Sequence, residues 1–107
     1  MSTTGQIRHM ALFWLKNPGS AEDRAMLAAG LETLRGIEQV RSLHIGMPAP
    51  TEARNVVDHS YALCESMVFD SAADQAAYQT HPVHLAFIDR CAHLWERVVV
   101  YDVTDFA

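Results

Sequence analysis

The first strand-like segment of the chain is apolar on both of its faces, which restricts the folds that the chain can adopt. Alternate residues along 7–16 fall on opposite faces of such a strand. One face carries Ile7, His9, Ala11, Phe13 and Leu15, and the other carries Met10, Leu12 and Trp14. A second segment, residues 98–103 with the sequence VVVYDV, is apolar at nearly every position. A strand with two apolar faces is packed against other structure on both sides. We therefore expect both segments to lie in a sheet whose two faces are both buried.

The length and charge of the chain limit it to one acidic domain. Its 107 residues support a single core, and a composition that is 50% hydrophobic and 20% charged excludes a disordered chain. The 13 acidic and 8 basic residues give a net charge of −5, without a basic cluster, which argues against nucleic-acid binding. We expect one domain at 7–103, a flexible N-terminus at 1–6 and a C-terminal tail at 104–107.

The early apolar run MALFWL is the only feature that resembles a targeting segment. It has six residues and lacks the basic start and the cleavage site of a secretory signal. No segment approaches the ~20 apolar residues that span a membrane. The sequence therefore predicts a soluble cytoplasmic protein without a membrane partner. Cys64 and Cys91 lack C-x-x-C spacing, and two buried free thiols are favoured over a disulfide.

The first half of the chain contains one helix and one further strand. A leucine stripe predicts a helix over residues 21–35, with Ser20 as its N-cap and Gly36 at its end. Residues 40–46 then form a short strand. The proline-rich and polar segment 47–60 is expected to be a long loop.

The second half repeats this order with a broken helix. Residues 61–69 form the third strand, and Ser71 caps a short helix that ends near residue 79. Pro82 begins another helix, whose apolar positions continue to Trp95. The resulting order β-α-β-β-α-β predicts a ferredoxin-like α+β fold, a four-stranded antiparallel sheet with helices on one face.

This architecture leaves one face of the sheet without helices, although the outer strands are apolar on both faces. A second copy of the chain is the simplest cover, so we expect a homodimer. The alternative is that the second face carries scattered exposed apolar side chains, as many monomers do.

Polar, titratable side chains gather in residues 78–84, YQTHPVH, within an amphipathic pattern. The residue before a proline is disfavoured in the helical region, so His81 lies at the joint between two helices. His84 falls in the first turn of the new helix and points inward with Phe87, where a neutral imidazole is favoured. Tyr78 is placed to direct its hydroxyl into the same space. The alternative is a buried Tyr and His that hydrogen-bond only to the backbone.

Two further side chains lie in the middle of predicted strands. His9 shares the face of Phe13 and is placed to meet His84 across the core. Glu65 is either a catalytic carboxylate or an edge or dimer contact with an arginine partner. The sequence has no metal-ligand spacing, Gly-rich phosphate loop or nucleophile elbow, so we expect neither a metal nor a cofactor.

Four segments together resemble a known family. They are Arg8–Phe13, Tyr61–Asp70, Tyr78–Phe87 and Trp95–Asp102, and their likeness to the stress-responsive A/B barrel (Dabb) family extends over residues 7–103. The Y-x-x-H-P-x-H segment with its downstream Phe is the most specific part. The resemblance implies a dimeric α+β barrel, with a pocket between sheet and helices in each subunit.

The resemblance also implies candidate roles for individual residues. In the family's plant polyketide cyclase, a Tyr and a His of this segment perform a cofactor-free aldol cyclisation, and these positions are Tyr78 and His84 here. The strand-one histidine of the family corresponds to His9. The plant enzyme has another histidine in its third strand, where this chain has Leu63, and the loop 47–60 also differs.

Two functions follow as expectations. The first is a family member without an assigned reaction that binds a small apolar ligand, with His9, His81 and Phe87 as binding residues. The alternative is a cofactor-free enzyme in which His84 is the base and Tyr78 the oxyanion donor.

Overall fold

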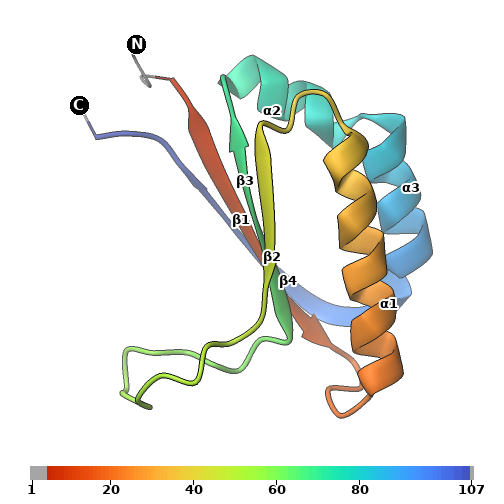
Figure 1. Ribbon diagram of the computed structural model, residues 1–107, viewed down its shortest axis with the longest axis vertical. Helices are drawn as coiled ribbons and strands as arrows, with labels where there is room; N and C mark the ends of the chain where they lie inside the picture. Colours follow the sequence, from red (N-terminus) through yellow and green to blue (C-terminus); the bar gives the residue numbers. More distant parts are fainter. Residues whose placement is uncertain (1–4, 107) are drawn as a thin grey trace.

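The computed structural model describes residues 5–106 and consists of a sheet with helices on one side (Figure 1). Its elements in chain order are β1 (Ile7–Leu15), α1 (Ala21–Glu32), η1 (Thr33–Gly36), β2 (Ser42–Gly46), β3 (Leu63–Phe69), α2 (Ala72–Gln79), α3 (Pro82–Cys91), η2 (Ala92–Leu94) and β4 (Trp95–Val103). The strands form one antiparallel sheet in the order β2-β3-β1-β4. The predicted ferredoxin-like α+β fold is confirmed. The predicted flexible N-terminus and tail include residues 1–4 and 107, which lie outside the described residues.

Local side-chain contacts start each helix where the sequence predicts. The hydroxyl of Ser20 accepts from the Asp23 amide at 3.0 Å, and that of Ser71 accepts from the Asp74 amide at 3.1 Å. Each contact satisfies an amide that has no partner within its helix. Pro82 is the first residue of α3. Within residues 5–106, no helix is long and apolar enough to cross a membrane.

The end of the last helix was predicted wrongly. α3 ends at Cys91, a short 3₁₀ turn follows, and Trp95 begins β4. Trp95 continues the helical spacing of Cys91, but its ring packs against Phe13, with centroids 5.0 Å apart. The contact with the sheet therefore overrides the local period. The helix predicted over residues 21–35 is also shorter than expected: the α-helix ends at Glu32, and a 3₁₀ turn follows from Thr33.

The core lies between the sheet and the helices. Leu27 and Leu31 of α1 are fully buried and face Met67 and Phe69 of β3, which are also fully buried. Helices α1 and α3 approach closely at Gly30, where an added Cβ would lie 2.5 Å from Cys91 Sγ. Both cysteines are free, as expected, and Cys91 is buried whereas Cys64 is half-buried.

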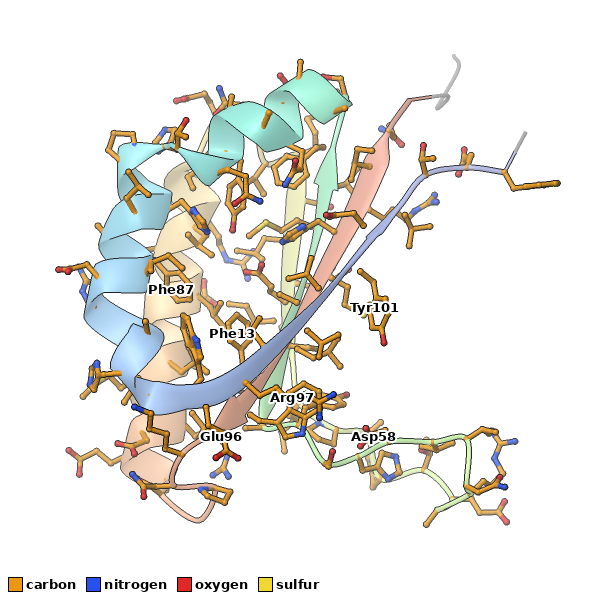
Figure 2. All side chains as sticks on the ribbon, turned by 180° about the vertical axis from the view of Figure 1, so that it is seen from behind. Phe13, Asp58, Phe87, Glu96, Arg97 and Tyr101 are labelled. Atoms are coloured by element: carbon orange, nitrogen blue, oxygen red, sulfur yellow. The ribbon has the colours of Figure 1, made fainter. Side chains whose placement is uncertain are left out.

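The opposite face of the sheet carries no helix (Figure 1), and its apolar side chains come mainly from β1 and β4. The register pairs Met10 with Tyr101 and Leu12 with Val99, and these side chains lie on the face away from the helices. Met10 is 41% exposed and Tyr101 59%. Figure 2 shows Tyr101 on the far side of β4 from Phe13. The second apolar face expected from the sequence is therefore uncovered in the single chain.

Candidate functional site

A cavity of about 270 Å³ lies between the sheet and the helices α2 and α3. Its walls come from three strands and two helices. The lining residues are His9, Ala11, Phe13, Glu65, Tyr78, Gln79, His84, Phe87, Ile88, Trp95, Val98 and Val100. Most of these side chains are apolar, and a few ionisable groups converge among them, which is typical of a small-molecule site.

The strand register gives this cavity a polar end and an aromatic end. His9 and Phe13 lie on the same face of β1, roughly 13 Å apart at about 3.3 Å per residue. On β4, Asp102 is opposite His9, and Val98 is opposite Phe13. The aromatic end is a cluster in which the Phe87 and Trp95 centroids are 5.7 Å apart. Figure 2 shows Phe13 and Phe87 between the sheet and α3.

At the polar end, His9 lies between two carboxylates. Its Nδ1 is 2.6 Å from Asp102 Oδ1, and its Nε2 is 3.4 Å from Glu65 Oε1. Burial lowers the pKa of His9, but the hydrogen bonds and charges of Glu65 and Asp102 outweigh burial and raise that pKa above its ordinary value. The cluster therefore favours an imidazolium held by two acids.

Glu65 does not lie where the second of its two predicted roles, an edge or dimer contact with an arginine, would place it. β3 is an inner strand, and Glu65 pairs with Ala11 on one side and Ile45 on the other, so it does not lie at an edge. Glu65 faces the helices and is only 2% exposed. None of the described residues that line the cavity beside it is an arginine. The expected arginine contact at an edge or dimer interface is therefore wrong. Among the described residues, Glu65 Oε2 is buried without a hydrogen-bond partner.

Tyr78 and His84 meet across the joint between α2 and α3, with ring centroids 4.4 Å apart. His84 Nδ1 donates to the Gln79 carbonyl at 3.1 Å, because a carbonyl oxygen can only accept. In the neutral ring this leaves the lone pair on Nε2. Burial, together with the charge of Glu65, raises the pKa of Tyr78 well above its usual range, so its hydroxyl remains protonated. The pair thus combines a basic nitrogen with a hydroxyl donor.

The structure brings four of the five predicted site residues to the cavity: His9, Tyr78, His84 and Phe87. His81 is elsewhere. Its Nδ1 accepts from the Val83 amide at 3.1 Å, and its Nε2 lies 3.2 Å from Glu38 Oε1. It acts as the N-cap of α3 and so fixes the turn in which His84 lies.

Sequence reasoning missed the partnership of Asp102 with His9 and the inward face of Glu65. A signal for Glu65 was available, since it alternates in phase with the apolar residues Leu63 and Met67. No comparable local signal marked Asp102, because its role depends on the pairing of the first and last strands. No group of three or more His, Cys, Asp or Glu side chains within residues 5–106 is arranged to hold a metal ion.

Comparisons with known proteins agree with this architecture. The model of the stress responsive A/B barrel domain matches residues 7–105. A Dabb family protein with a ferredoxin-like fold from Mesorhizobium loti is 26% identical, with 97% of this chain and 100% of that chain covered and a TM-score of 0.77. A dimeric protein with a ferredoxin-like fold from Bacteroides fragilis is 22% identical (coverage 95% and 98%, TM-score 0.75). A hydroxynitrile lyase from Passiflora edulis is 20% identical (coverage 95% and 94%, TM-score 0.78). No curated protein matches the sequence.

Proposed function

Because this chain belongs to the stress responsive A/B barrel family, we propose that it binds a small, mainly apolar organic molecule in the cavity between the sheet and the helices. The observation that carries this proposal is the cavity of about 270 Å³, with an aromatic end at Phe13, Phe87 and Trp95 and a polar end at His9 and Glu65. Its size, just below the roughly 300–1,000 Å³ of typical ligand pockets, suits a molecule with one or two rings.

The binding unit is proposed to be a homodimer. Met10, Leu12 and Tyr101 leave an apolar sheet face without a helical cover in the single chain. An isologous contact between two copies buries such a face on both subunits at once. The similar solved structure from Bacteroides fragilis is described as dimeric, which supports this arrangement.

Binding is tested with butylbenzene, a one-ring hydrocarbon. Trp95 lines the cavity, and the chain has two tryptophans, so the variant Trp14→Phe reports Trp95 fluorescence alone. We expect saturable quenching that Ala11→Leu abolishes, because Ala11 lines the cavity and the added carbons fill it. The matched control Met10→Leu, on the opposite face of the same strand, retains the titration. Quenching that survives Ala11→Leu would contradict the proposal.

A second candidate function is cofactor-free enolisation, favoured by the contact of Tyr78 with His84. Nε2 of His84 takes a proton from the carbon beside a carbonyl, and the Tyr78 hydroxyl donates to the oxygen of the resulting enolate. The imidazolium exchanges this proton with solvent and then delivers a solvent-derived proton to the enolate carbon, which restores the neutral imidazole. Among proteins of this fold, the hydroxynitrile lyase from Passiflora edulis is an enzyme, which supports a catalytic use of the scaffold.

The enzyme candidate is tested by exchange of the methyl protons of acetophenone in deuterated buffer, followed by NMR. We expect exchange above the buffer rate, reduced by roughly 10²–10⁴-fold in His84→Ala and by roughly 10²–10³-fold in Tyr78→Phe. His93→Ala, an exposed control on η2, retains the rate. Exchange at the buffer rate, or equal rates in His84→Ala and the native chain, would exclude this reaction.

A further inference from the structure

We propose that the cavity selects molecules carrying a protonated amine on an apolar body, with the ammonium group bound at the carboxylate of Glu65. This inference rests on the proposed ligand-binding function and names the chemical class of the ligand. Three observations support it: the buried oxygen of Glu65 without a partner, the net charge of the polar end, and the order of side chains along the cavity.

The first observation concerns hydrogen bonding. Glu65 lines the cavity and is 2% exposed, and its Oε1 lies 3.4 Å from His9 Nε2. Its Oε2 has no hydrogen-bond partner among the described residues. Most buried polar atoms in proteins have a partner, and leaving a charged acceptor without one is costly. A donor on the ligand removes that cost, whereas a purely hydrocarbon ligand leaves it in place.

The second observation concerns charge. Glu65 and His9 line the polar end of the cavity, and Asp102, whose side chain is half-exposed outside the lining, contacts His9 from its other side. The cluster therefore carries a charge of −1 with His9 protonated and −2 with His9 neutral. None of the described residues that line the cavity is Lys or Arg. A ligand cation balances this charge, which a hydroxyl cannot do, so an ammonium group is favoured over an alcohol.

The third observation gives the orientation of the ligand. Glu65 pairs with Ala11, midway along β1 between His9 and Phe13. The aromatic end begins two residues further along, where Phe13 and Trp95 centroids are 5.0 Å apart. An ammonium group at Glu65 therefore leaves an apolar tail directed toward Phe13, Phe87 and Trp95. The ligand class is a short aralkyl or alkyl amine.

The experiment compares three molecules of matched shape: 3-phenylpropylamine, 3-phenylpropanol and butylbenzene. Dissociation constants are measured by Trp95 fluorescence in the Trp14→Phe chain at neutral pH. We expect the amine to bind at least about tenfold more tightly than the other two, as a hydrogen bond to a charged group warrants. Equal or tighter binding of the alcohol or the hydrocarbon would overturn the inference. Binding of butylbenzene alone would leave the proposed function standing, whereas binding of none of the three would refute both.

The variant Glu65→Gln preserves the shape of the side chain and removes its charge. We expect the amine preference to fall to about one, with the affinity for butylbenzene retained. Glu65→Asp keeps the charge but withdraws the carboxylate by one methylene, so it should also weaken amine binding. This variant provides the test if Glu65→Gln fails to fold. Glu96→Gln is the matched control, since Glu96 is an exposed acid of β4 outside the cavity lining. An equal loss in Glu96→Gln would show non-specific attraction and overturn the inference.

Discussion

Replacing Gly30 by alanine tests the closest contact between two helices, which sets the position of α3 and hence of the cavity wall. An added Cβ would lie 2.5 Å from Cys91 Sγ and 3.1 Å from Phe87 Cδ1. Such overpacking costs about 1–3 kcal/mol. Alanine is favoured over glycine inside a helix by about 1 kcal/mol. The difference predicts a net destabilisation of about 1 kcal/mol, or a Tm lower by roughly 4–6 °C.

The assay is thermal and urea unfolding at one protein concentration, with circular dichroism as the signal. A double-mutant cycle assigns the cost to one atom, because Cys91→Ala removes the sulfur that the new Cβ meets. In the Cys91→Ala background, Gly30→Ala should be neutral or stabilising by about 0.5–1 kcal/mol. The coupling between the two positions is then at least about 1 kcal/mol.

Gly36→Ala is the matched control, since nothing lies within 4 Å of a Cβ added there. It should be neutral or stabilising by up to about 1 kcal/mol, since the added Cβ meets no neighbour. If Gly30→Ala raises the Tm in the native background, or if the coupling with Cys91 is absent, the close approach of α1 and α3 is refuted.

The His9 cluster, the outer face of the sheet and the cap of α2 can each be tested by one substitution. Glu65 and Asp102 raise the pKa of His9 in the folded chain. Protonated His9 therefore stabilises the fold at pH values below its unfolded pKa of about 6.5. This stabilisation is lost as the pH rises through the pKa of His9 in the folded chain. Asp102→Asn should lower the His9 pKa in an NMR titration and reduce that loss; an unchanged pKa would contradict the pairing. Tyr101→Asp places a charge on the outer face of the sheet and should convert the proposed dimer to a folded monomer in sedimentation. A native chain that is monomeric at micromolar concentration would exclude the proposed dimer. Ser71→Ala removes the cap of α2 and should cost about 1 kcal/mol in urea unfolding, whereas no change would show that the cap is dispensable.

The order of elements followed from local patterns in the sequence. Ser20 and Ser71 mark helix starts because a capping hydroxyl acts within three residues of its amide. The alternation along residues 7–15 assigned both faces of β1, since side chains alternate in any strand. His84 and Tyr78 were placed at the cavity for a similar reason, because helical spacing defines an inner face.

The features that sequence reasoning missed depend on contacts between distant segments. Asp102 reaches His9 because β4 pairs with β1, 93 residues apart in the chain. The alternation of β3 marks the inward face of Glu65, but its place on an inner strand, away from an edge, follows only from the pairing of β3 with both β1 and β2. Trp95 follows a helical period but is held by Phe13 of the sheet. In each instance, strand pairing or ring packing decided a position that local propensity left open.

The first and last described segments of the chain end side by side (Figure 1). Arg8 Nη1 lies 3.1 Å from Asp105 Oδ1, and the Thr104 hydroxyl donates to the Gln6 carbonyl at 2.9 Å. Residues 6 and 104 are therefore neighbours in space, although they are 98 positions apart in the chain, and a short linker can connect these two segments. The long segment 47–62 is a suitable place for new ends, since exposed loops tolerate chain breaks. A circular permutant opened there keeps all four strands and the complete cavity, with β1 and β4 joined as a continuous hairpin.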